Sequence, residues 1–118
     1  MVPTTFTLDI PIFAKLYDFY KNLSQVIVGF PKTKRYTLGQ NIDQITLDTI
    51  ELVITAGYIP REQKLPALRK VSIKLDILKI LMRLALETKC LDNNKYQTLI
   101  SQIMEIGKML GGWIKAVK

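Results

Sequence analysis

Apolar residues recur at intervals of three and four along four stretches of the chain, and this period constrains the fold more than any other feature. Such a spacing places the apolar side chains on one face of an α-helix. The stretches cover about residues 10–28, 38–57 and 66–89, and a fourth runs from about residue 95 to near the C-terminus. Short connections separate them. The sequence therefore predicts an all-α fold, an antiparallel up-down four-helix bundle formed by residues 1–118 as a single domain.

The connections carry signals for where the helices begin. Residues 31–36 form a basic connection headed by proline, after which Thr37 is predicted to be an N-cap with Gln40 reaching back to complete a capping box. Residues 61–64 form a polar linker, and we expect the third helix to begin at about Pro66. Residues 91–94 are expected to form a turn in which an Asp or Asn caps the fourth helix.

The chain contains no histidine and a single cysteine, Cys90. The absence of histidine excludes Ser-His-Asp and Cys-His catalysis, histidine zinc sites and the Glu-x-x-His di-iron bundle. Because there is also no glycine-rich phosphate loop, we expect no enzymatic activity, no cofactor and no metal. Cys90 is interpreted as a small hydrophobe in a reducing compartment.

The sequence lacks the signals of membrane insertion and export. No apolar run approaches the ~18–20 residues that a membrane span needs. Residues 1–5 lack the basic start and apolar block of a signal peptide. We therefore expect a cytoplasmic protein with no membrane partner.

The third helix is apolar on two opposite sides. On a helical wheel, one broad side carries seven apolar residues: Leu68, Val71, Leu75, Leu78, Met82, Ala85 and Leu86. A second stripe, almost opposite, carries Ile73, Ile77, Ile80 and Leu84. One stripe suffices for the bundle core, so the second predicts self-association through this helix or its neighbour. The alternative is that the small bundle wraps this helix on both sides.

Positive charge is concentrated in a few places along the chain. Lys and Arg number 17 against 10 Asp and Glu, which gives a net charge of +7. Basic residues cluster in the first connection, around the start of the third helix, and at an i,i+4 pair within it: Lys32, Lys34 and Arg35; Arg61, Lys64, Arg69, Lys70 and Lys74; Lys79 and Arg83. This pattern favours salt-dependent binding of nucleic acid or an acidic partner. The alternative is a solvated basic face that only keeps the protein soluble.

The fourth helix contains three glycines near its end. Gly107 and Gly111 have the spacing of a G-x-x-x-G pair, which we interpret as close approach to a neighbouring helix. The pair Gly111 and Gly112 predicts a packing constraint or a local break in the helix. Trp113, in register with Leu110, is expected to be a core residue.

Two separated segments of the chain resemble signatures of a known group of small bacterial four-helix-bundle proteins. Residues 30–40 (FPKTKRYTLGQ) resemble the segment that connects helices one and two in this group. Residues 106–114 (IGKMLGGWI) resemble its C-terminal signature. The group includes the accessory variability determinant proteins of diversity-generating retroelements and the proteins encoded by ribosomal RNA intervening sequences.

The retroelement branch of this resemblance implies a barrel-shaped homopentamer of four-helix bundles without catalytic activity of its own. Such a protein associates with the retroelement reverse transcriptase and binds nucleic acid, the template RNA or DNA, in support of mutagenic retrohoming. By position, the resemblance implies a role in binding for Lys79 and Arg83, supported by Arg69, Lys70 and Lys74. The intervening-sequence branch implies the same bundle as an interaction protein without a nucleic-acid role.

Overall fold

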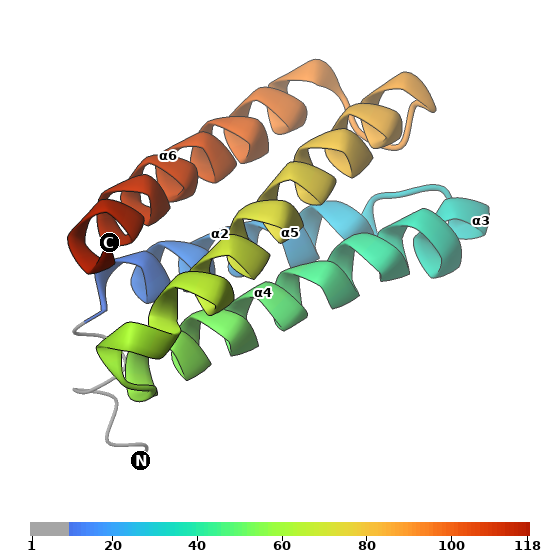
Figure 1. Cartoon of the computed structure of the whole chain (residues 1–118). Helices are drawn as coiled ribbons and strands as arrows, with labels where there is room; N and C mark the ends of the chain where they lie inside the picture. Colours follow the sequence, from blue (N-terminus) through green and yellow to red (C-terminus); the bar gives the residue numbers. More distant parts are fainter. Residues whose placement is uncertain (1–9) are drawn as a thin grey trace, which may run out of the picture.

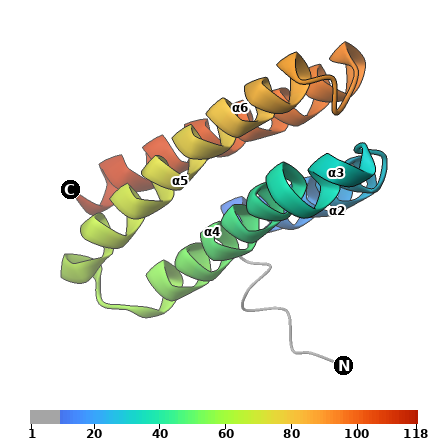
Figure 2. The ribbon, with the colours of Figure 1, turned by 90° about the vertical axis from the view of Figure 1, so that its right-hand side faces the viewer.

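The computed structural model describes residues 10–118, and four long helices account for most of them. Helices α2 and α5 each pack against both α4 and α6, so the four enclose one apolar core (Figures 1 and 2). This confirms the expected all-helical four-helix bundle. The elements in chain order are α2 (Pro11–Val28), a short α3 (Lys32–Lys34), the π-helical turn η1 (Arg35–Gly39), α4 (Gln40–Tyr58), α5 (Arg61–Glu87) and α6 (Asn93–Val117).

The expectations about export and about membrane insertion concern different parts of the chain. Residues 1–5, whose composition argued against a signal peptide, lie outside the described residues. Within residues 10–118, every helix is too short or too polar to cross a lipid bilayer.

The core forms where the apolar period of each helix faces the others. In α2 the buried side chains are spaced by four, three and four residues, starting at Ile12 and ending at Leu23. In α6 the spacing from Leu99 to Leu110 is four, three and four again. In an α-helix these intervals keep side chains on one face, so both helices bury a single stripe.

Two threonines of α4 are completely buried in this otherwise apolar interior. Each hydroxyl donates a hydrogen bond to the carbonyl one turn earlier, Thr46 to Ile42 at 2.8 Å and Thr49 to Ile45 at 2.7 Å. Because both polar groups are satisfied within the helix, their burial does not leave an unpaired donor in the core.

The predicted capping box before α4 is wrong, because the chain is already helical by Lys32. Pro31 occupies the N-cap position with φ −53°, and α3, η1 and α4 continue without a break. Thr37 therefore lies inside the helical segment, where its hydroxyl donates to the carbonyl of Thr33 at 3.1 Å. Gly39 is buried in the π-helical turn, and a Cβ there would lie 3.1 Å from Cγ2 of Ile27. A side chain at this position would require Ile27 to move by a few tenths of an ångström, so glycine favours the close contact between α2 and η1.

The predicted start of the third helix at Pro66 is also wrong. Helix α5 begins at Arg61, so the four residues expected to form a polar linker are its first turn, and Pro66 lies inside the helix. Pro60 at the N-cap sets an extended backbone from which the helix starts. The side chains of this first turn make hydrogen bonds to two other helices, as described below, and these contacts hold the additional turn.

Helix α5 ends in a motif that normally uses glycine. The amide of Cys90 donates to the carbonyl of Ala85 at 2.8 Å, and the amide of Lys89 donates to Leu86 at 3.1 Å. This is the pattern of a Schellman motif, in which the residue at Lys89 takes a left-handed conformation, here with φ 62°. A non-glycine residue there costs roughly 1–2 kcal/mol. The same turn buries Cys90, which behaves as a small hydrophobe as predicted.

Helix α6 begins with the side-chain cap predicted for this turn. The Asp92 carboxylate accepts a hydrogen bond from the amide of Lys95 at 2.8 Å. This backbone hydrogen bond lowers the pKa of Asp92 below its ordinary value, with smaller contributions from the Lys95 ammonium. The carboxylate therefore stabilises the first turn of α6 while it is ionised.

Shortening a side chain on the buried face of α5 should destabilise the protein far more than shortening one on its exposed face. Leu78 is completely buried, and we expect Leu78→Ala to lower the free energy of unfolding by about 2–5 kcal/mol. Ile80, two residues further, is 66% exposed, and Ile80→Ala should cost less than about 0.5 kcal/mol. Urea unfolding of both variants at low protein concentration measures this difference. Equal losses at the two positions would contradict the placement of Ile80 on the outside of the bundle.

Candidate interaction surface on helix α5

The second apolar stripe of α5 lies on the outside of the bundle. Ile73 is 59% exposed, Ile80 66% and Leu84 45%, and Ile77 between them is partly exposed. The opposite side of the same helix, including Leu75 and Leu78, is buried. The alternative that the bundle wraps α5 on both sides is therefore wrong. We call Ile73, Ile77, Ile80 and Leu84 the outer stripe.

The predicted basic residues of α5 do not form one cluster, because the outer stripe divides them. Lys70 and Lys74 lie on the side that faces α4, where they line a depression of about 420 Å³ with Asp48, Glu51 and Ile73. The Lys74 ammonium lies 4.0 Å from the Asp48 carboxylate. This side of the stripe thus carries both signs of charge.

Lys79 and Arg83 lie together on the other side of the outer stripe, as their i,i+4 spacing predicted. They line a shallow depression of about 370 Å³ with Ile80, Leu84 and Glu87. Each is paired within its own helix: Lys79 with Asp76 at 3.5 Å, and Arg83 with Glu87 at 2.7 Å. The hydrogen bond to Glu87 raises the pKa of Arg83 further, so this guanidinium stays charged.

Arg69 is exposed near the start of α5, well away from the pair at its far end. At a rise of about 1.5 Å per residue, Arg69 and Arg83 are separated by roughly 21 Å along the helix. The five candidate residues therefore border the outer stripe along most of its length and do not converge on one point.

Two basic residues at the start of α5 have a structural role that the sequence did not reveal. The Arg61 guanidinium donates to the carbonyl of Ala116 in α6 at 2.8 Å, and the Lys64 ammonium donates to the carbonyl of Ala56 in α4. Both acceptors belong to the last turns of their helices, where carbonyls lack partners within the helix. Cations there also complement the helix dipole. Arg61 and Lys64 thus join three helix ends.

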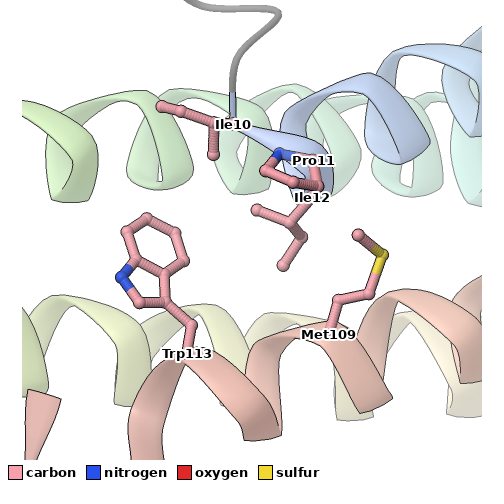
Figure 3. A pocket seen from close by; sticks show the side chains of 5 residues that line it. All are labelled: Ile10, Pro11, Ile12, Met109 and Trp113. Carbon is pink, nitrogen blue, oxygen red and sulfur yellow. The ribbon is translucent and has the colours of Figure 1, made fainter. Parts of the chain in front are cut away.

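An apolar pocket of about 510 Å³ opens beside the start of α2 (Figure 3). Its walls come from α6, through Met109 and Trp113, and from the residues around Pro11. Trp113, predicted to be a core residue, packs against the core and also borders this pocket. The Lys64 ammonium lies 6.0 Å from the centre of the Trp113 ring. The tryptophan is therefore half-buried and contacts a cation.

The interpretation of the α6 glycines is wrong for a single bundle. A Cβ built at Gly107, Gly111 or Gly112 would meet no atom of another segment within 4 Å, so no other helix of residues 10–118 approaches closely there. The predicted break is also absent, because α6 continues as one helix to Val117. The helical hydrogen bonds of α6 and the buried residues before Gly111 hold this turn despite its low helix propensity.

The described residues offer no obvious place for a metal. Among residues 10–118, no three Asp, Glu, Cys or His side chains gather closely enough to hold a metal ion.

A comparison with models of known protein families gives a match over nearly the whole bundle. The model of the bAvd-like family matches residues 11–117, which is nearly the whole chain. The chain belongs to the bAvd-like family. A search of curated proteins found no similar sequence. This membership confirms the resemblance to the accessory variability determinant proteins.

The contribution of the Lys64 hydrogen bond to stability can be measured against a matched lysine elsewhere on α5. Lys64→Met keeps most of the aliphatic chain and removes the donor to Ala56, so we expect a loss of about 0.3–1 kcal/mol in the free energy of unfolding. Lys70→Met removes the same charge from an exposed position and should change stability by less. Thermal unfolding followed by circular dichroism measures both. An unchanged free energy of unfolding in Lys64→Met would show that the hydrogen bond from Lys64 to Ala56 is not stabilising.

Proposed function

We propose that this protein is a non-catalytic accessory subunit of a diversity-generating retroelement. It binds the reverse transcriptase and the template RNA in the cytoplasm and supports mutagenic retrohoming. The observation that carries this proposal is the match of the bAvd-like family to residues 11–117. The basic residues that border the outer stripe of α5 offer a surface for a polyanion, and the outer stripe itself offers a surface for another protein. Such a subunit needs both.

In this proposal the chain forms an up-down bundle that assembles into a homopentameric barrel. The outer stripe supports the assembly, because three of its four side chains are well exposed and lie in one row. Contiguous apolar patches of this kind on a soluble protein usually mark an interface. Asp48 and Lys74 on one side of the row, and Asp76 and Lys79 on the other, supply complementary charges for its rim.

Lys79 and Arg83 are the first candidates for contact with RNA or with the reverse transcriptase. Their ion pairs with Asp76 and Glu87 are solvent-exposed, and pairs of this kind contribute little free energy. A phosphate can therefore replace the carboxylate partner at little cost. Arg69, Lys70 and Lys74 extend the positive charge along α5.

Charge reversal at the i,i+4 pair tests this assignment. We expect Lys79→Glu combined with Arg83→Glu to weaken binding of both template RNA and reverse transcriptase by at least tenfold, roughly 1.4 kcal/mol. Co-purification measures binding of the enzyme, and fluorescence anisotropy measures binding of the RNA. Circular dichroism verifies the fold. Undiminished binding by a folded double variant would show that these two residues are not the site.

The assembly is tested by light scattering after gel filtration at low and high salt. We expect a mass near that of five subunits, with co-purified nucleic acid released only at high salt. Ile73→Gln combined with Ile80→Gln should shift the mass towards that of the monomer, because it places polar groups in the apolar row. A wild-type monomer or dimer free of nucleic acid would instead favour an intervening-sequence-type interaction protein.

A further inference from the structure

One end of the bundle carries basic side chains that no acidic residue neutralises. The segment from α2 to α4 and the turn between α5 and α6 lie at this same end in both views (Figures 1 and 2). Residues 29–39 and 87–95 together contain five basic residues and two acidic ones. We call this surface the basic end: Lys32, Lys34, Arg35, Tyr36 and Lys89.

The ion pairs of the structure distinguish the basic end from α5. Within residues 10–118, no carboxylate lies within 4.0 Å of the ammonium groups of Lys32, Lys34 or Lys89. The two acids of this end are already engaged, Glu87 by Arg83 and Asp92 by Lys95. On α5, Lys74, Lys79 and Arg83 each have a carboxylate partner, whereas Arg69 and Lys70 have none among the described residues. The positive charge of the basic end is therefore less compensated than that of the Lys79 and Arg83 pair.

Arg35 is only weakly held by hydrogen bonds within the fold. Its Nε is buried and has no hydrogen-bond partner among the described residues, and one terminal nitrogen makes a long hydrogen bond of 3.4 Å to the carbonyl of Phe30. Beside it, Tyr36 exposes 63% of its surface. An exposed aromatic ring among cations is typical of surfaces that bind single-stranded nucleic acid, where bases stack on the ring.

Lys89 occupies a position whose backbone favours glycine. Its φ of 62° lies in the left-handed region, and the Schellman motif at the end of α5 would form with less strain if the residue were glycine. The lysine therefore makes the fold less stable than glycine would, and it places a positive charge at the tip of the turn. Strain of this kind is concentrated at functional positions.

A groove lies between the second half of α2 and the first turns of α6. It has a volume of about 280 Å³, and its walls include Val26 and Leu99. Amide, hydroxyl and ammonium groups supply most of its polar atoms, from Asn22, Gln25, Asn94, Lys95 and Thr98. Such groups donate to phosphate oxygens and to the edges of unstacked bases.

We propose that the basic end is a second surface for single-stranded RNA, separate from the outer stripe of α5. The RNA backbone lies against Lys32, Lys34 and Lys89, and a base stacks on Tyr36. This inference rests on the proposed RNA-binding function, and it adds a surface that leaves the outer stripe available for protein contacts.

The test compares two triple variants that each remove three positive charges. The first is Lys32→Gln, Lys34→Gln and Lys89→Gly at the basic end. The matched control is Lys108→Gln, Lys115→Gln and Lys118→Gln along the second half of α6. The probe is fluorescein-labelled oligouridylate, with Kd measured by anisotropy between about 50 and about 200 mM salt.

We expect the first variant to bind at least tenfold more weakly than the wild type, and the control to bind within a factor of about two of it. The slope of log Kd against log salt should fall by about 2, since each lost phosphate contact removes about 0.7 for single strands. A folded first variant that binds like the wild type, or equal losses in both variants, would overturn the proposal. Wild-type protein that does not bind RNA would overturn the proposed function itself.

Two further measurements separate binding from folding and RNA from other polyanions. Lys89→Gly alone should raise the melting temperature, because it relieves the left-handed strain, while weakening RNA binding roughly threefold. Unchanged RNA affinity in this variant would remove Lys89 from the surface. If poly-L-glutamate competes for the site as well as unlabelled oligouridylate does, the surface recognises acidic protein and the RNA assignment is wrong.

Discussion

Burial of the inner face of α5 against α4 and α6 is the interaction on which the rest of the structure depends. Because α5 is apolar on two opposite sides, burying one side necessarily turns the other outward. The core therefore determines where Ile73, Ile80 and Leu84 appear on the surface. The orientation of α5 about its own axis also places Lys70 and Lys74 beside α4. It places Lys79 and Arg83 on the opposite side of the outer stripe.

The basic residues of this chain divide into three groups by what surrounds them. Arg61 and Lys64 donate to carbonyls at the ends of α6 and α4, so their charge serves the fold. Lys74 and others on α5 have carboxylate partners. Lys32, Lys34 and Lys89, like Arg69, Lys70 and others, have no such partner among the described residues. Because the positive charges differ in this way, a net charge of +7 does not by itself identify a binding surface.

Residues 30–40, the first of the two segments that carried the family resemblance, have a clear structural purpose in this chain. Phe30 is buried, Pro31 precedes the first helical residue, and Gly39 allows α2 and η1 to touch. The exposed residues between them, Lys32, Lys34 and Tyr36, are not required by these contacts. One short segment thus fixes the turn between two helices and presents the basic end to solvent.

The sequence by itself determined the four helices and the two apolar sides of α5, because each depends only on the local helical period. It also predicted that an Asp or Asn within residues 91–94 caps the fourth helix, and that Lys79 and Arg83 lie on one side of a helix. The tertiary structure decided the rest. Residues 61–64 are helical because Arg61 and Lys64 donate hydrogen bonds to carbonyls of α6 and α4. Thr37 is not an N-cap, because the helical segment already begins after Pro31. No local pattern shows which carbonyls a distant side chain will meet, so only the packed bundle separates structural cations from free ones.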